Sequence, residues 1–325
     1  MAKIMMVPDV HGSHEWEAVK DDSGVDFTVI LSDLVDAWKN RWPDQGENVT
    51  NLVSWVREKP EKRILLFGNH DQAYISRSRH GANVSGHQWE HHDEICKLLF
   101  QARDVLRLAW ECDGWVFSHA GFSKTAVDHM KHVMHGLFDE KPLRHDFASD
   151  EEAHAYYDSL KVWDEGEYSI DLLNCTFRQF MDDLYNDTTM MKWLNFNEAL
   201  DWRGVFSGSG DEPEQFCLWI RPRALLQDAA YQKQAVGHTE YALWNEPLLL
   251  ADKKHGSQVM LFDSPLHTPY LFDTEAPMPK AWNYFDFEKR LSALGKEVND
   301  MKSQKRSKED FIEVFGKLGE YFYEK

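Results

Sequence analysis

Four short apolar runs within the first 120 residues constrain the fold most strongly, because each one ends directly in a polar, acidic or glycine-containing loop. These runs are Lys3 to Val7, Phe27 to Leu31, Arg63 to Phe67 and Trp115 to Phe117. Between them, Asn48 to Glu58 and Glu94 to Leu108 carry apolar residues at helical spacing. Strand, loop, helix and strand in this order are typical of a sheet covered by helices, so we predict an α/β fold.

The chain changes character from Lys124 to Leu200, where it becomes acidic and aromatic. Helical patterns occur around Glu151 to Leu160 and Ile170 to Leu184. We predict that residues 124–200 form a helical insertion that packs beside the sheet and walls one side of a cleft. Further strand signals then predict a second sheet; they are Phe216 to Ile220, Gln234 to Val236, Gln258 to Phe262 and Pro269 to Phe272.

The segment from Tyr284 to Lys325 is charged and amphipathic, and we predict a helical C-terminal tail there. Its apolar side consists of Phe311, Ile312, Val314, Phe315 and Leu318. Together these patterns predict one domain over residues 1–325, with the helical insertion at 124–200 and the tail at 284–325.

Composition bounds the class of protein. Hydrophobic residues make up 42% of the 325 residues and aromatic residues 13%, which argues against disorder over most of the length. The formal net charge of −19 argues against non-specific binding of nucleic acid or anionic lipid, because both require a positive surface. A local metal cluster could still make the field positive at one site.

Cysteine usage and the N-terminal segment indicate the compartment. The four cysteines lie far apart with no Cys-x-x-Cys pair, which is typical of reduced thiols in the cytosol. Asp9 follows the N-terminal apolar run so closely that a cleavable signal has no room. No apolar run approaches the roughly 20 residues that span a bilayer. We therefore predict a cytoplasmic protein that does not bind membranes.

Asp9 and His11 are the first candidate metal ligands. They lie two residues apart directly after an apolar run, so both side chains can point to the same side of a loop. One carboxylate with one imidazole suits manganese, iron or zinc better than magnesium or calcium. The alternative is an aspartate that caps a turn beside a surface histidine.

Polar side chains also follow the later apolar runs. Asp33 has two carboxylate oxygens and could bridge two ions roughly 3.5–4 Å apart, or it could cap a helix. Asn69 follows Gly68, and its neutral oxygen suits a site that already carries several carboxylates. His119 and His238 each follow a strand signal beside a small residue; either could instead be a buried structural histidine.

The order of these motifs resembles the calcineurin-like metallophosphoesterases. More narrowly, it is similar to the phosphoprotein-phosphatase branch, with its bacterial and phage serine/threonine phosphatases and the symmetrical diadenosine tetraphosphate hydrolases. The motifs are Asp9-Val10-His11-Gly12, Ser32-Asp33-Leu34-Val35-Asp36, Gly68-Asn69-His70-Asp71, Ser118-His119-Ala120-Gly121 and Gly237-His238-Thr239. The insertion and the C-terminal tail lie outside the resemblance.

The resemblance implies a central two-sheet β-sandwich flanked by helices and a site for two divalent metal ions. Manganese is the first expectation, with iron or zinc as alternatives. It implies that Asp9, His11 and bridging Asp33 hold the first ion. The second ion would be held by Asp33, Asn69, His119 and His238.

The resemblance also implies the reaction, which is attack of a water between the ions on phosphorus. His70 would protonate the leaving oxygen, and Asp36 would hold the imidazole of His70. The expected substrate is a phosphomonoester in a phosphoprotein, nucleotide or small molecule, as in serine/threonine phosphatases. A phosphodiesterase or dinucleoside polyphosphate hydrolase is the alternative, and a binding protein without turnover is a third hypothesis.

The chain departs from the family pattern at two positions. Ser32 replaces a glycine, which is a mild change if the backbone there has a negative φ. Ala37 replaces an arginine that clamps the substrate phosphate in the phosphatase branch. Arg221 or Arg223 in Trp219-Ile220-Arg221-Pro222-Arg223 could take over phosphate binding, or could pair with surplus acidic residues. Trp38 could stack on a nucleobase.

Two groups of histidines remain outside the motifs. His129, His132 and His135 recur every three residues along one predicted helix face, where a solvated polar face competes with a second metal site. His87 and His92 lie near His91 beside a charged helical segment.

Overall fold

The structure is a computed structural model. It describes residues 2–36, 42–75, 84–139, 169–186, 190–201, 211–240, 247–263, 268–278, 281–284 and 289. The chain divides into two compact units, Met1–Ala281 and Trp282–Lys325. In the second unit the described residues include the short strand β11 (Trp282–Asn283). The predicted helical stretch Glu151 to Leu160 and most of the predicted tail lie outside the described residues, as do Ala37 and Trp38.

The first sheet has five strands in the order β10-β1-β2-β3-β4. Its strands are β1 (Lys3–Val7), β2 (Phe27–Ile30), β3 (Arg63–Leu66), β4 (Leu106–Arg107) and β10 (Tyr270–Asp273). β1 to β4 run parallel, with Val7 opposite Ile30 and Ile30 opposite Leu65. β10 joins the edge antiparallel to β1. The three N-terminal strand predictions are confirmed.

The second sheet runs, within the first unit, in the order β8-β9-β7-β6-β5. These strands are β5 (Ala109–Cys112), β6 (Trp115–Ser118), β7 (Lys233–Val236), β8 (Leu248–Asp252) and β9 (Ser257–Leu261). β6, β7 and β9 are parallel, and β5 and β8 pair antiparallel with β6 and β9. Two mixed sheets flanked by helices confirm the predicted α/β class with two sheets.

The sheets pack face to face through alternate residues of their strands. Ile4 and Met6 of β1 and Ile64 of β3 lie in one buried cluster with Phe117 of β6 and Met260 of β9. The intervening residues of the first sheet join a second, larger cluster that includes the helices. Because successive residues of a strand point to opposite faces, this alternation produces a central sandwich layer and a helix-facing layer.

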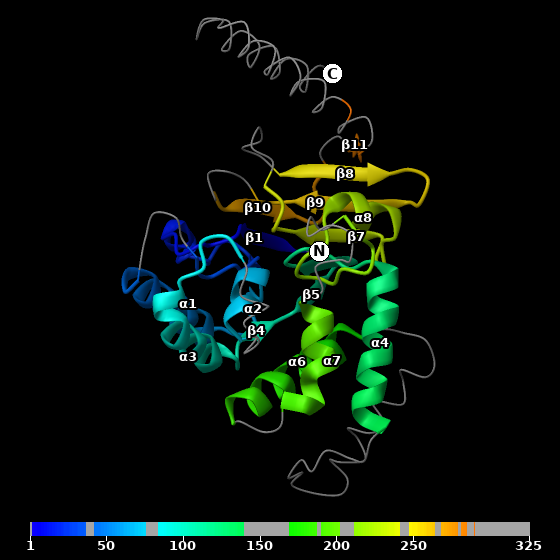
Figure 1. The fold of residues 1–325 in the computed structure, drawn as a ribbon. Helices are drawn as coiled ribbons and strands as arrows, with labels where there is room; N and C mark the ends of the chain where they lie inside the picture. Colours follow the sequence, from blue (N-terminus) through cyan, green and yellow to red (C-terminus); the bar gives the residue numbers. More distant parts are fainter. Residues whose placement is uncertain are drawn as a thin grey trace, which may run out of the picture. The chain divides into compact units, whose positions relative to one another are not determined.

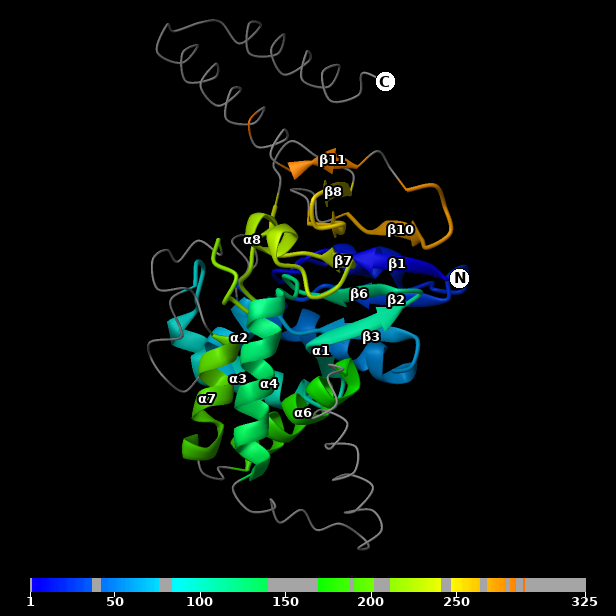
Figure 2. The ribbon, with the colours of Figure 1, turned by 90° about the vertical axis from the view of Figure 1, so that its right-hand side faces the viewer.

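Helices cover the outer faces of both sheets. They are η1 (Glu15–Val19), α1 (Asp44–Glu58), α2 (Asn69–Ile75), η2 (Trp89–His91), α3 (His92–Ala102), α4 (Lys124–Asp139), α6 (Ile170–Tyr185), α7 (Met190–Leu200) and α8 (Pro222–Gln227). α1 contacts β3, and α8 contacts β8 and β9. Figures 1 and 2 both show α4, α6 and α7 grouped on the same side of the sheets.

The predicted insertion contains these three helices. Ser169 caps α6, since its hydroxyl accepts from the amide of Leu172, and the Asn174 side chain accepts from the amides of Leu108 and Ala109. α6 thereby fastens to β4 and β5, at the edges of the two sheets. α4 packs against α7. That residues 124–200 are an insertion within one domain stays a prediction.

Three sequence-based assignments are wrong. Phe216 to Ile220 is a turn rather than a strand, because the amides of Trp219 and Ile220 both donate to the carbonyl of Phe216 at 3.0 and 3.3 Å. The helix expected to reach Leu108 ends at Ala102, and Leu106–Arg107 pairs with β3 as β4. The strand expected from Pro269 to Phe272 joins the first sheet, not the second.

The histidine row after Lys124 lies on α4. His129 and His132 are exposed there, as expected of a solvated polar face. The side chain of His135 is outside the described residues. Among the described helices, none combines the length and hydropathy needed to cross a membrane.

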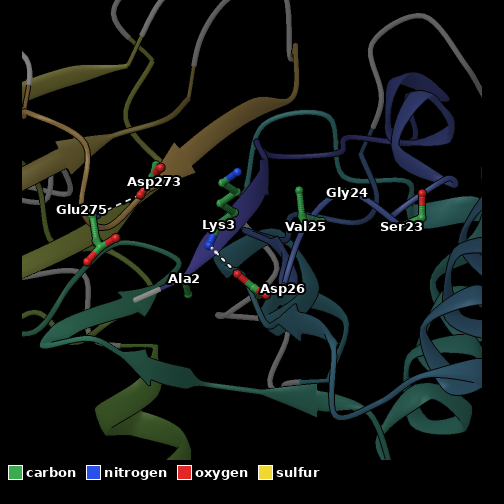
Figure 3. A pocket seen from close by; sticks show the side chains of 8 residues that line it. All are labelled: Ala2, Lys3, Ser23, Gly24, Val25, Asp26, Asp273 and Glu275. Carbon is green, nitrogen blue, oxygen red and sulfur yellow. Dashed lines mark hydrogen bonds between the residues drawn. The ribbon is translucent and has the colours of Figure 1, made fainter.

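A polar pocket of about 370 Å³ lies at the amino-terminal ends of β1 and β2 (Figure 3). Lys3 and Asp26, at the amino-terminal ends of β1 and β2, line it together with Asp273 and Glu275. The amide of Lys3 donates to Asp26 at 2.8 Å, and the amide of Glu275 donates to Asp273 at 2.9 Å. The pocket therefore occupies the opposite end of the strands from every predicted site residue.

A buried ion pair ties α1 to the start of β3. Arg63 donates to Asp22 Oδ2 at 2.8 Å and to Glu58 at 2.9 Å, and its guanidinium lies 4.0 Å from the ring of Trp55. Burial raises the pKa of Asp22, but hydrogen bonds from Arg63 and Lys59 outweigh it and lower that pKa to about 2.

We expect Asp22→Asn to lower the free energy of unfolding by about 2–3 kcal/mol at pH 7. The folded pKa of Asp22 lies below its unfolded value, so this stabilisation is complete above about pH 5 and disappears as pH falls toward 2. Urea unfolding followed by circular dichroism checks it, with Asp93→Asn on the surface of α3 as the control. A difference between wild type and variant that is as large at pH 3 as at pH 7 contradicts this account.

Candidate metal centre

The predicted metal residues all lie where parallel strands of the two sheets end. Asp9 and His11 follow β1, Asp33 follows β2, Asn69 follows β3, His119 follows β6 and His238 follows β7. Backbone hydrogen bonds join the loops, from the amide of Val10 to Ser32 O at 2.8 Å and from the amide of Gly237 to His119 O at 2.8 Å. The carboxyl ends of both sheets therefore meet at one site, as is usual for functional sites of such sheets.

One group of ligand atoms surrounds Asn69. Its side-chain oxygen Oδ1 lies 2.8 Å from His119 Nε2 and 3.2 Å from His238 Nδ1, and the two histidine nitrogens lie 3.2 Å apart. His119 Nε2 also lies 3.5 Å from Asp33 Oδ2. Asp33, His119 and His238 could hold a metal ion together, and the Asn69 oxygen lies among them.

The tautomer of His119 explains why a cation fits this group. His119 Nδ1 donates to the carbonyl of Leu31 at 2.9 Å, so Nε2 of a neutral ring carries a lone pair. Burial lowers the pKa of His119. Burial and the neighbouring His119 together lower the pKa of His238 well below its ordinary value. The lone pair of His119 Nε2, the amide oxygen of Asn69 and the carboxylate of Asp33 then face one another, an arrangement that a bound divalent ion stabilises.

A second group of ligand atoms includes His11, Asp33 and His70. His11 Nδ1 donates to the carbonyl of Val35 at 3.1 Å, which leaves Nε2 facing Asp33 Oδ2 at 3.7 Å. The rings of His11 and His70 meet edge to face with centroids 4.8 Å apart. His70 thus lies where a metal ligand could also lie, although the sequence predicted a proton donor there.

Asp9 belongs to neither of these two groups of ligand atoms, but it lies beside His119 and His238. Its Oδ2 accepts from the amide of His238 at 2.9 Å, and its Oδ1 lies 3.7 Å from His119 Nδ1. Asp9 Oδ1 is buried and has no hydrogen-bond partner among the described residues. Burial, together with the charges of Asp263 and Asp33, raises the pKa of Asp9 well above its ordinary value. Such a carboxylate requires either a proton or a cation.

Asp33 is common to both groups. Its Oδ1 accepts from the amide of His70 at 3.0 Å, and its Oδ2 faces His11 and His119. Burial disfavours its charge, but His119 and three further histidines outweigh burial and lower the pKa of Asp33. An ionised carboxylate between two sets of imidazoles has the placement expected of a bridging ligand.

His70 and Asp36 form the predicted proton-donor pair. His70 Nδ1 donates to Asp36 Oδ2 at 2.9 Å, and Asp36 is fully buried. Burial lowers the pKa of His70, but the carboxylates of Asp33 and Asp36 outweigh it and raise that pKa. The ring is therefore oriented through Nδ1, and Nε2 is the nitrogen that can face a substrate.

Backbone strain is concentrated at this site. His11, Ser32, Asp33, Asp36 and His238 all have positive φ, at 43°, 91°, 47°, 69° and 58°. Ser32 therefore occupies the conformation in which glycine is favoured, so the substitution is not the mild change expected for a negative φ. Residues held in such regions cluster at functional sites.

Asp71 stabilises these strained loops, a role the sequence did not reveal. It accepts from Ser32 Oγ at 2.6 Å, from the amide of Gly68 at 3.0 Å and from the amide of Leu34 at 3.0 Å. Burial and the charge of Asp33 raise the pKa of Asp71 to about 7. Its position directly after His70 was the available signal. The hydroxyl of Ser32 thus contributes a bond that glycine would lack.

Asp263 is a further residue that sequence reasoning missed. It lies two residues after β9, and its charge is, after burial, the largest cause of the raised pKa of Asp9. β9 pairs parallel with β7, so this carboxylate lies at the same edge as His238. An acidic residue directly after the apolar run Gln258 to Phe262 was the same signal that identified Asp33.

Arg221 and Arg223 flank the start of α8, and both are exposed. After burial and His119, the positive charge of Arg221 is among the causes that lower the pKa of His238. Arg221 therefore lies within electrostatic reach of the metal residues. Among the described residues, neither guanidinium forms a hydrogen bond with a predicted metal residue.

Two of the motif glycines, Gly68 and Gly237, are required by close packing against metal residues. A Cβ at Gly68 would lie 2.1 Å from Asp33 Oδ1, and a Cβ at Gly237 would lie 2.2 Å from Asp9 Oδ1. Contacts this short force the carboxylates to move.

We expect Gly237→Ala to weaken divalent-metal binding about 10- to 100-fold, because its Cβ displaces the carboxylate of Asp9. Gly24→Ala is the matched control, since a Cβ at Gly24 meets no atom within 4 Å. Metal titration by calorimetry, with circular dichroism to verify folding, distinguishes them. Equal metal affinity in both variants contradicts a role for Asp9 in the centre.

The chain has only distant similarity to known proteins. No family model matches it, and neither does any curated protein. A crystal structure of a cold-active protein-tyrosine phosphatase from the psychrophile Shewanella sp. has a TM-score of 0.43 at 15% identity and covers 82% of this chain and 72% of its own. A second structure of a cold-active protein tyrosine phosphatase has a TM-score of 0.43 at 16% identity and covers 82% of this chain and 71% of its own. A metallophosphoesterase from Sphaerobacter thermophilus has a TM-score of 0.22 at 22% identity, covering 40% of this chain and 55% of that protein. Similarity at this level does not assign a family.

Proposed function

We propose that this chain is a metal-dependent phosphoester hydrolase with a dinuclear centre. The observation that carries the proposal is the carboxylate of Asp33, which lies between two groups of potential metal ligands and belongs to both. Two divalent ions, when bound, lower the pKa of an attacking water and neutralise the charge of the phosphoryl oxygens. Manganese suits the mixed imidazole and carboxylate donors, with iron or zinc as alternatives.

The proposed ligands follow the two groups. Asp9, His11 and Asp33 hold one ion, and Asp33, Asn69, His119 and His238 hold the other. The buried Oδ1 of Asp9, which has no hydrogen-bond partner among the described residues, supports the first set. The convergence of Asn69 Oδ1, His119 Nε2 and His238 Nδ1 supports the second.

His70 acts as the general acid in this proposal. Its Nδ1 proton is held by Asp36 at 2.9 Å, so the proton at Nε2 is the one that can pass to the leaving oxygen. The raised pKa of His70 keeps the ring protonated at higher pH, which favours this role over that of a metal ligand. Asp36 retains the charged ring in one orientation throughout.

Phosphomonoesters are the proposed substrates, as in serine/threonine protein phosphatases, and they include phosphoproteins, nucleotides and small phosphoesters. A monoester carries two negative charges, and the electrostatic reach of Arg221 to the metal residues supports a positively charged site for them. One observation favours a second candidate. Ala37 replaces the clamping arginine, and a phosphodiester or dinucleoside polyphosphate brings less charge per phosphate to be held.

We expect the manganese-loaded protein to hydrolyse p-nitrophenyl phosphate in preference to bis-p-nitrophenyl phosphate, because the centre neutralises the larger charge of the monoester. Removal of metal with a chelator abolishes turnover, and added manganese restores it. Release of p-nitrophenolate measures both reactions. Preference for the diester supports the second candidate, and metal-independent turnover overturns the dinuclear proposal.

We expect Arg221→Ala to raise KM for p-nitrophenyl phosphate about tenfold, because its positive charge, which contributes to the lowered pKa of His238, would attract the substrate dianion. Arg223→Ala is the matched control, since it removes an equally exposed arginine from the same helix start. Steady-state kinetics of the two variants give the comparison. A larger effect from Arg223→Ala assigns phosphate binding to that residue instead.

A further inference from the structure

A buried tyrosine, Tyr74, hydrogen-bonds to the oxygen of Asp36 that does not contact His70. Tyr74 lies on α2 four residues after His70, so both side chains occupy one helix face, and it is fully buried. Its hydroxyl donates to Asp36 Oδ1, while Asp36 Oδ2 accepts from His70 Nδ1 at 2.9 Å. The carboxylate of Asp36 is therefore held by one donor at each oxygen.

The hydroxyl of Tyr74 is itself fixed. It accepts from the backbone amide of Gln88 at 2.8 Å, which leaves its own proton directed to Asp36. Burial and the charge of Asp36 raise the pKa of Tyr74, so the hydroxyl stays protonated and remains a donor. A continuous chain of hydrogen bonds thus runs from the amide of Gln88 to the imidazole of His70.

The ring of Tyr74 is held as firmly as its hydroxyl. His87 stacks on it with centroids 4.2 Å apart and planes 14° apart, and His92 lies against it at 5.4 Å. His87 and His92 belong to the group of histidines that no motif explained. Their packing excludes water from the Tyr74 side of Asp36 and prevents the phenol from rotating away.

A carboxylate with only one partner can rotate about its Cβ–Cγ bond and swing away from an imidazole. A second donor on its other oxygen fixes the plane and keeps Oδ2 directed at His70 Nδ1. This matters only if His70 must present Nε2 to a leaving oxygen in a defined direction.

We infer that Tyr74 is a positioning residue for the general acid: by anchoring Asp36, it holds His70 in the orientation that delivers a proton to the leaving group. The inference rests on the proposed function. It concerns residues outside the metal ligands, and it extends the proton-donor pair to Tyr74 and the amide of Gln88.

Leaving-group dependence tests the role in catalysis. Protonation matters most when the leaving oxygen is basic, so we expect Tyr74→Phe to lower kcat/KM about tenfold for phenyl phosphate and less than about twofold for p-nitrophenyl phosphate. Tyr231→Phe is the matched control, because it removes the same hydroxyl from a tyrosine packed on Phe122, outside the proton-donor pair. Equal loss on both esters, or no loss, overturns the inference.

The His70 Nδ1 proton gives a readout that does not require activity. We expect a protected downfield proton signal in nuclear magnetic resonance spectra of the protein, assigned by its absence in His70→Asn. In Tyr74→Phe this signal should broaden through faster exchange with water, whereas in Tyr231→Phe it should persist. An unchanged signal overturns the inference, while an inactive protein with the expected spectral change overturns only the proposed function.

Tyr74→Phe removes a single oxygen and keeps the stacked ring, so folding is expected to survive. Should the variant unfold, 3-fluorotyrosine at position 74 keeps both ring and hydroxyl and makes the hydroxyl a stronger donor. A shift of the His70 signal then supports the chain of hydrogen bonds, and an unchanged signal overturns it.

Discussion

The burial of charge at Asp33 is the constraint on which the site depends. A carboxylate in the interior is costly unless every oxygen is compensated. One amide, from His70, supplies part of this compensation, and the imidazoles of His11 and His119 face the other oxygen through Nε2. Neutral rings that present lone pairs cannot supply the rest, whereas divalent cations can. The two sheets matter because only their joined carboxyl edges bring β1, β2, β3, β6 and β7 to a single point.

This convergence is maintained against backbone strain. Positive φ angles at His11, Ser32, Asp33 and His238 each cost on the order of 1–3 kcal/mol for a residue other than glycine. The rigid sandwich below the loops offsets that cost, since the strands leading into them are almost fully buried. Asp71 adds three hydrogen bonds to the loop ends. The stability of the sandwich therefore holds the candidate metal ligands in backbone conformations that they would not adopt in a free loop.

Much of this arrangement could be predicted because polar residues directly after apolar runs lie at strand ends. That rule placed Asp33 and Asn69 correctly beside one another. It failed for Phe216 to Ile220, a buried turn whose hydrophobicity imitates a strand. It also gave no sign that Tyr74 anchors Asp36, because that contact depends on the pitch of α2 and on the packing of Gln88 above it. Interactions between segments distant in sequence leave no local pattern.

In the proposed reaction, the residues assigned to proton donation and those assigned to phosphate binding are unequally ordered. In the donor half, His70, Asp36 and Tyr74 form one hydrogen-bonded chain. In the phosphate half, Arg221 is the proposed arginine, and its side chain is exposed. Binding energy that is not available for the phosphate must come from interactions with the transition state. Protonation of the leaving oxygen is such an interaction, and its benefit increases with the basicity of that oxygen. In the proposed reaction, a positioned proton donor therefore benefits alkyl esters, such as those of serine and threonine, more than aryl esters, whose leaving groups need less protonation.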